Sequence, residues 1–161
     1  MKRVLLIAVN AKYIHSNPAV YSLKAYAQAA LEDLNVEIDI AEYTINQNTE
    51  NILADIYRRK PDIAAFSCYI WNWNTIQGLL PEIPKLLPET KLWLGGPEVS
   101  FHAEKILEQY SYLDGIMVGE GEQTFTELVR FYQTEEGSLL DIKGLVLPTG
   151  RTPVRELTDM N

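Results

Sequence analysis

Short apolar runs alternate with helical patterns along this chain. Two of the runs, RVLLIAV and DIAAFSC, are nearly continuous apolar stretches, typical of strands covered on both faces of a sheet. A third run, VEIDIAEY, alternates apolar and polar residues, as expected for a strand at a sheet edge. The pattern predicts strands over residues 3–9, 36–42, 62–68, 91–94 and 115–118. It predicts helices over residues 18–32, 49–59, 75–87, 102–109 and 122–132.

Capping residues and prolines mark several helix boundaries. Asn17 followed by Pro18 is a favourable pair of N-cap and first helical residue. The segment 74–77, with the sequence NTIQ, resembles an asparagine-led capping box and predicts the start of the third helix. Pro81 and Pro84 must bend or break that helix, because proline cannot donate a backbone hydrogen bond.

Five β–α repeats with short loops indicate an α/β fold with a doubly wound, five-stranded parallel sheet and right-handed crossovers. We expect the flavodoxin-like, Rossmann-like strand order 2-1-3-4-5. The segment KGLVLPTGRTPVRE predicts a C-terminal β-hairpin around Thr149 and Gly150. We therefore expect an α/β domain over residues 1–142, followed over 143–161 by the hairpin and a linker. The polar end LTDMN reads as that linker, so we expect one domain of a longer protein.

Composition narrows the functional class. The chain has 161 residues, 47% of them hydrophobic, which suffices for one domain with a sizeable core. Its formal net charge of −8 argues against a nucleic-acid surface, since binding phosphates needs clustered Lys and Arg. Cys68 is the single cysteine, so the chain has no intrachain disulfide and no cysteine set for zinc or iron–sulfur. The apolar run at the N-terminus is too short for a signal peptide or a membrane span, so we expect a cytoplasmic protein without a membrane partner.

A ligand of an open α/β sheet binds beyond the carboxyl ends of the strands, at the topological switch point. In the expected order this point lies between the first and third strands. The loops there are residues 10–17, with His15, and residues 69–74, which include the aromatic sequence YIWNW. The loops GGPEVS and GEGE, after the fourth and fifth strands, are neighbours. Each loop also has a plain structural interpretation, as a turn, a helix cap or packing onto a helix.

Several chemistries find no support in these loops. A receiver domain needs acidic residues after the first strand and an Asp ending the third, and those places hold Asn10 and Cys68. No G-x-G-x-x-G or Walker loop is present, and the first loop lacks the Ser and Thr of a flavodoxin phosphate loop. Cys68 as a nucleophile would need a nearby base, for which only His15 is available, and no sequence feature supports that pair.

Four segments together carry a resemblance to a known family: NAKYIHSNPAVYSLKAYA, PDIAAFSCYIWN, LWLGGPEVSF and GIMVGEGEQTFTEL. They resemble the N-terminal cobalamin (B12)-binding-type domain of B12-dependent radical SAM proteins, in particular the group similar to Mg-protoporphyrin IX monomethyl ester oxidative cyclases. The resemblance covers nearly the whole chain. Radical SAM domains carry a CxxxCxxC cluster motif that this sequence lacks, so S-adenosylmethionine and a 4Fe-4S cluster would belong only to a downstream domain of the same polypeptide.

The resemblance implies where cobalamin would lie. The corrin ring would cross the carboxyl ends of the strands, and the nucleotide tail would enter between the first and third strands. Ser67 matches the usual serine position at the end of the third strand, and Gly95 and Gly96 match the glycines beside the tail. The candidate cofactor-binding residues are Asn10, Tyr13, His15, Ser16, Asn17, Ser67, Tyr69, Trp71, Gly95, Gly96, Pro97, Glu98, Gly119, Glu120, Gly121 and Glu122.

The sequence departs from one pattern of the family. B12 domains of the methionine-synthase type carry Asp-x-His-x-x-Gly, whose histidine is the lower cobalt ligand. Here His15 keeps its register, but Tyr13 replaces the Asp and Pro18 replaces the Gly. Losing the Asp removes the acceptor that orients a metal-binding imidazole. We expect His15 to line the pocket and order its loop, with cobalt ligation as the alternative.

The resemblance implies a domain that positions B12 over a catalytic barrel and has no catalysis of its own. The parent protein would be a methyltransferase or an oxidative cyclase-like enzyme. Two other classes stay open. One is a B12-free module that docks the radical SAM domain through its aromatic loop, and the other is a flavin- or nucleotide-binding flavodoxin-like protein.

Overall fold

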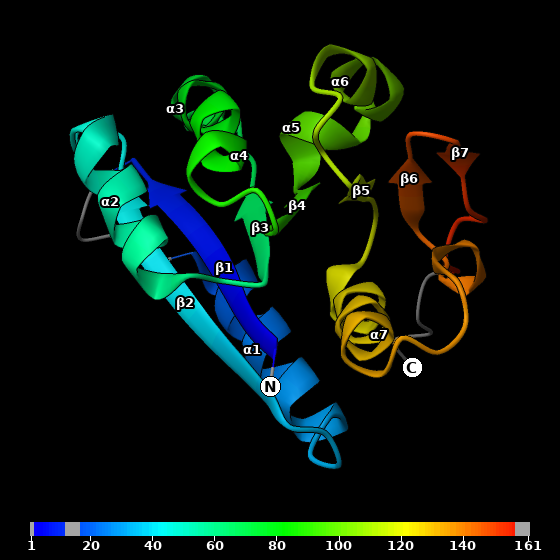
Figure 1. The fold of residues 1–161 in the computed structure, drawn as a ribbon. Helices are drawn as coiled ribbons and strands as arrows, with labels where there is room; N and C mark the ends of the chain where they lie inside the picture. Colours follow the sequence, from blue (N-terminus) through cyan, green and yellow to red (C-terminus); the bar gives the residue numbers. More distant parts are fainter. Residues whose placement is uncertain (1, 12–16, 157–161) are drawn as a thin grey trace.

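A single seven-stranded sheet organises the chain, in the order β2-β1-β3-β4-β5-β6-β7 (Figure 1). It is seen in a computed structural model that describes residues 2–11 and 17–156. The strands are β1 (Lys2–Asn10), β2 (Val36–Thr44), β3 (Ile63–Ser67), β4 (Lys91–Gly95), β5 (Gly115–Met117), β6 (Leu145–Leu147) and β7 (Gly150–Arg151). The first five strands are parallel and have the predicted order. The predicted hairpin is β6 and β7, and it extends the sheet because β6 pairs antiparallel with β5.

Helices cover both faces of the sheet (Figure 1). They are α1 (Pro18–Ala30), α2 (Thr49–Arg59), α3 (Trp73–Leu79), α4 (Ile83–Leu86), α5 (Pro97–Ser100), α6 (Ala103–Gln109) and α7 (Gly121–Thr134), with 3-10 turns η1 (Leu80–Glu82) and η2 (Leu139–Asp141). Helices α1 and α7 share one face with a core that includes Leu6 and Phe125. Helices α2 to α6 share the other face with a core that includes Ile7 and Phe66. None of the described helices combines the length and apolar character needed to cross a membrane.

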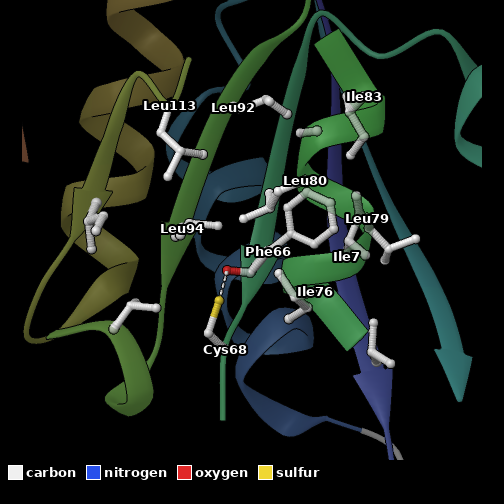
Figure 2. Close-up of a cluster of buried hydrophobic side chains, with 14 of the residues drawn as sticks. Ile7, Phe66, Cys68, Ile76, Leu79, Leu80, Ile83, Leu92, Leu94 and Leu113 are labelled. Atoms are coloured by element: carbon white, nitrogen blue, oxygen red, sulfur yellow. Dashed lines mark hydrogen bonds between the residues drawn. The ribbon is translucent and has the colours of Figure 1, made fainter. Parts of the chain in front are cut away.

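Successive side chains of each strand point to opposite faces of the sheet and so belong to different cores. In β1, Leu6 and its alternate neighbours face α1 and α7, while Leu5 and Ile7 face the opposite side. This confirms the prediction of a strand buried on both faces. Figure 2 shows the second core, in which Phe66 of β3 and Ile7 of β1 meet side chains from α3, η1 and α4.

The helix boundaries confirm some capping predictions and correct others. The Asn17 side chain accepts a hydrogen bond from the Ala19 amide at 3.0 Å, as expected of the N-cap of α1. Two prolines divide the predicted third helix into α3, η1 and α4, as expected. The capping box predicted at residues 74–77 is wrong, because α3 already begins at Trp73. The residue in the cap position is Asn72, whose side chain bonds to the neighbouring strands instead of to the helix.

The two edges of the sheet differ in length. Strand β2 forms one edge and pairs with β1 over nine residues, from Lys2↔Val36 to Asn10↔Thr44. Its side chains alternate in burial, and Asp39 and Glu42 are exposed. The other edge is the two-residue strand β7. Beyond β7, Arg155 bonds to Glu127 and Thr124 of α7 and thereby holds the end of the described chain against that helix.

Candidate functional site

A cavity of about 150 Å³ lies at the carboxyl ends of the parallel strands, on the face covered by α1 and α7. Leu6 and Ala65 contribute its apolar wall from β1 and β3, and Val20 and Leu23 close it from α1. Its position is the switch point between β1 and β3, where the chain leaves the sheet in opposite directions. The fold therefore forms a narrow slot where an α/β protein binds its ligand.

The structure brings many of the predicted site residues together. Those that line the slot are Ser67, Tyr69, Gly95, Gly96, Gly119, Gly121 and Glu122. Those that line a second, more open groove next to it are Tyr69, Trp71, Pro97 and Glu98. Asn17 borders the slot through its bond to Ser67, whereas Asn10 bonds to Glu42 of the edge strand, away from the slot. Glu120 is the N-cap residue of α7. Tyr13, His15 and Ser16, including the candidate cobalt ligand, lie outside the described residues.

Two consecutive glycines shape the slot for different reasons. Gly96 has φ +103° and ψ 167°, and a Cβ there would lie 2.8 Å from the backbone nitrogen of Cys68 and closer still to its carbonyl oxygen. Only glycine adopts this conformation without strain. A Cβ on Gly95 would instead meet ordinary contacts, the nearest being the Met117 carbonyl oxygen at 3.7 Å. Gly96 is thus required by the backbone, while Gly95 lines the slot without a side chain and could accept a methyl group.

Polar groups cluster at one side of the slot. The Asn17 side-chain amide donates to the Ser67 hydroxyl at 3.0 Å, and its carbonyl oxygen accepts from the amide of Ala19. The Tyr69 hydroxyl lies 3.5 Å from that same Asn17 oxygen. Asn17 therefore ties the start of α1 to the end of β3. The Ser67 hydroxyl keeps its own proton to donate, so it can bond to a ligand in the slot.

Asn72 is a structurally central residue that the sequence analysis did not single out. Its side chain is fully buried. The amide nitrogen donates to the carbonyl oxygens of Val9 and Ser67, both at 3.0 Å, and the amide oxygen accepts from the Tyr69 backbone at 2.8 Å. The signal available in the sequence was an asparagine between two tryptophans, in the loop that follows a buried strand.

The second groove is bordered by exposed apolar side chains. Ile70 and Phe101 expose 81% and 85% of their surface, and Trp71 exposes 48%. The rings of Tyr69 and Trp71 stack in parallel, with centroids 4.4 Å apart and planes 7° apart. Tyr69 lines both the slot and the groove, so the two hollows adjoin at this residue. Exposed apolar groups gathered on one rim are typical of a surface that receives a ligand or another domain.

Cys68 lies on the opposite face from the slot. Its thiol is fully buried in the core of α2 to α6 and donates to the Phe66 carbonyl oxygen at 3.7 Å (Figure 2). Burial raises the pKa of the Cys68 thiol far above its usual range, so the group stays protonated. A protonated, inaccessible thiol is unsuited to nucleophilic catalysis. Over residues 2–11 and 17–156, no three His, Cys, Asp or Glu residues are grouped so that they could hold a metal ion.

Comparison with known proteins assigns the family. The profile of the B12 binding domain matches residues 4–129. The cobalamin-dependent radical SAM methyltransferase TokK of Streptomyces tokunonensis is 27% identical over 95 residues, which are 59% of this chain and 14% of TokK.

Two solved structures share the fold. The cobalamin-dependent S-adenosylmethionine radical enzyme OxsB, with aqua-cobalamin and S-adenosylmethionine bound, aligns over 98% of this chain with a TM-score of 0.81 and 18% identity. The radical S-adenosylmethionine methyltransferase TsrM of Kitasatospora setae, with cobalamin and a [4Fe-4S] cluster bound, aligns over the whole chain with a TM-score of 0.73 and 22% identity. The chain covers 23% of the OxsB chain and 30% of the TsrM chain. With its family profile matched over most of its length, this chain belongs to the B12-binding domain family.

Proposed function

We propose that this chain is the cobalamin-binding domain of a B12-dependent radical SAM enzyme and positions the cofactor for a catalytic domain of the same polypeptide. The observation that carries the proposal is the slot at the switch point, between the strand ends and helices α1 and α7. Family membership supports the cofactor class, and the resemblance to radical SAM enzymes supports the kind of parent protein.

The residues of the slot fit the nucleotide tail of cobalamin. A slot of about 150 Å³ is too small for the whole cofactor and suits a slender, flat part of it. Its wall is apolar, as a planar aromatic base requires, and the hydroxyl of Ser67 and the amide of Asn17 lie at one side for the polar groups of the tail. Gly95 presents backbone without a side chain, which allows close approach of a bulky ligand.

The corrin ring would lie outside the slot, over the second groove and its apolar rim. Tyr69, at the junction of the two hollows, would contact both the tail and the ring, and Trp71 would support the ring edge. Glu98 lines the groove and would lie at the ring rim, whereas Gly119, Gly121 and Glu122 line the slot and would lie beside the tail. When bound, cobalamin supplies a cobalt centre that carries a methyl group or exchanges electrons, and the chain's own residues bind and orient it.

We propose binding without a histidine ligand. Pro18 is the first residue of α1 and Asn17 caps that helix, so in the sequence His15 comes two residues before a fixed helix cap. Tyr13 replaces the aspartate that orients the metal-binding histidine in B12 domains of the methionine-synthase type. The His15→Ala protein should therefore bind hydroxocobalamin with an unchanged axial-ligand spectrum. A spectral change relative to the wild type would assign His15 as the lower ligand.

A titration with hydroxocobalamin tests the proposed function. We expect saturable one-to-one binding, followed by absorbance and by equilibrium dialysis. Ser67→Leu, which fills the slot, should weaken binding strongly. Ser138→Ala is the matched control, because it removes a hydroxyl that caps η2 away from the slot. Absence of binding to the wild type, or equal binding by Ser67→Leu, would contradict the proposal, and preferential binding of flavin mononucleotide would favour the flavodoxin-like alternative.

The apolar rim favours a second candidate function, a docking module that works without B12. Ile70 and Phe101 are highly exposed and line the same groove. Exposed apolar side chains that lie together mark interaction surfaces. This function would be supported if the wild type does not bind cobalamin but does bind a separately produced radical SAM portion of its own polypeptide. Ile70→Ser combined with Phe101→Ser should then abolish that association, and unchanged association would exclude the rim as the docking surface.

A further inference from the structure

We propose that Asn72 is a positioning residue of the cofactor site, which holds Ser67 and Tyr69 at the slot by joining the ends of β1 and β3. The inference rests on the proposed function and deepens it. Asn72 itself does not line the slot, so it acts on a ligand through the two residues that it orients.

The location of Asn72 explains its three hydrogen bonds. The pairing of β1 with β3 ends at Ala8↔Ser67, while β1 continues along β2 to Asn10. The carbonyl oxygens of Val9 and Ser67 therefore come at the point where the two strands stop pairing. The Asn72 amide nitrogen bonds to both oxygens and thereby continues the hydrogen bonding between β1 and β3 beyond their last paired residues. Its two N–H groups and its oxygen are thus all used within the protein.

These bonds fix the two slot residues that the ligand would meet. One bond holds the Ser67 carbonyl, and the hydroxyl of the same residue accepts from Asn17. Another holds the Tyr69 backbone nitrogen, which sets the ring of Tyr69 against Trp71 and near the Asn17 oxygen. Because a rigid site loses less freedom on binding, this fixation favours affinity.

The side chain has no competing role at the helix. Asn72 occupies the N-cap position of α3, yet it makes no side-chain bond to that helix. Within the described residues, its side chain bonds to the strand ends and to Tyr69, at sequence separations that reach 63 residues. The geometry therefore assigns this asparagine to the switch point.

Two substitutions of Asn72 remove different numbers of its three side-chain hydrogen bonds. Asn72→Asp keeps the size of the side chain and the acceptor for Tyr69, but it loses both donated bonds. Asn72→Ala loses all three. Thr90→Val is the control, because it removes a side-chain bond to the carbonyl oxygen of Pro61 on a loop at the opposite end of the sheet. Under conditions where each variant is fully folded, both Asn72 variants should bind hydroxocobalamin about tenfold more weakly or worse, and Thr90→Val should match the wild type.

A second measurement needs no cofactor. The parallel stack of Tyr69 and Trp71 contributes to the near-ultraviolet circular dichroism, and Trp71→Leu defines that contribution as a difference spectrum. We expect Asn72→Ala to lose the same component and Thr90→Val to keep it. If both Asn72 variants bind hydroxocobalamin with wild-type affinity and keep the circular dichroism signal of the Tyr69–Trp71 stack, the inference is overturned. The proposed function would still stand. If the wild type does not bind cobalamin, the proposed function fails, and an intact component in Asn72→Ala would also overturn the positioning role.

Discussion

Replacing Gly96 by alanine should cost more stability than any other Gly→Ala change around the slot. The backbone at φ +103° and ψ 167° belongs to a region that is nearly exclusive to glycine, so an alanine there costs about 1–3 kcal/mol. Its Cβ would also press on the backbone of Cys68, which cannot move without disturbing β3 and the following loop. Overpacking of this kind costs about 1–3 kcal/mol more. Together the loss is about 2–6 kcal/mol, a large part of the 5–15 kcal/mol typical of a domain.

Urea unfolding, followed by tryptophan fluorescence and far-ultraviolet circular dichroism, measures this loss. With an m-value of about 2 kcal/mol/M, a loss of about 4 kcal/mol lowers the midpoint by about 2 M. Gly119→Ala is a matched control, since Gly119 has φ +79° but no atom lies within 4 Å of its added Cβ. That variant should lose only about 1–2 kcal/mol of backbone strain. Gly95→Ala, with ordinary contacts only, should change stability by less than about 1 kcal/mol.

The expected order of destabilisation is therefore Gly96→Ala first, Gly119→Ala second and Gly95→Ala last. A Gly96→Ala protein no less stable than Gly119→Ala would refute the steric part of the reasoning. A Gly96→Ala protein as stable as the wild type would refute the backbone part as well.

Three further substitutions test the core and its buried polar groups by urea unfolding. Burial raises the pKa of Asp114, so the contribution of this carboxyl to the unfolding free energy should fall as pH rises above about 4. Asp114→Asn keeps an acceptor for the Leu92 amide and should remove that contribution, so the difference in unfolding free energy between wild type and variant should change with pH. A difference that stays constant with pH would reject this reasoning. Tyr132→Phe leaves the indole N–H of fully buried Trp93 without its acceptor and should cost about 1–3 kcal/mol, whereas a neutral result would mean that the bond contributes nothing. Leu80→Ala removes a fully buried side chain between two helical turns and should cost about 2–5 kcal/mol; a loss under 1 kcal/mol would show that the cavity collapses.

Local patterns in the sequence predicted the parallel sheet well. The continuous apolar runs became β1 and β3, which are buried on both faces, and the alternating run became the edge strand β2. The turn at Thr149 and Gly150 became a hairpin as predicted. These features depend on periodicity and turn chemistry, which neighbouring residues determine.

Features that depend on distant partners escaped prediction. The addition of β6 to the sheet needs a pairing with β5, about 30 residues earlier in the chain, and no local pattern encodes it. The start of α3 was misplaced for a similar reason, since Asn72 bonds to Val9 across 63 residues of sequence. The short helix α5 was missed because Gly96 and Pro97 read as a plain turn.

The candidate site was predictable to the level of its loops. Glycines and a serine at strand ends are visible in the sequence, and the structure gathers Ser67, Gly95 and Gly96 around one slot. Asn17 was predicted as a helix cap and as a candidate cofactor-binding residue, but its bond to Ser67 was not predicted. Asn72 was seen only as part of an aromatic loop, and its bonds to the strand ends were missed. Hydrogen bonds between side chains and distant backbone depend on the folded geometry.

The long edge strand β2 has a consequence for how copies of this protein behave toward one another. The outer edge of this nine-residue strand is a template on which a second molecule could add its own strand and begin a fibre. Asp39 and Glu42 are exposed along β2, so two such edges that approached each other would bring carboxylates together. Like charges that face each other across paired strands are destabilising. The acidic residues of β2 therefore act as gatekeepers against sheet-to-sheet polymerisation, and the net charge of −8 adds a general repulsion between copies.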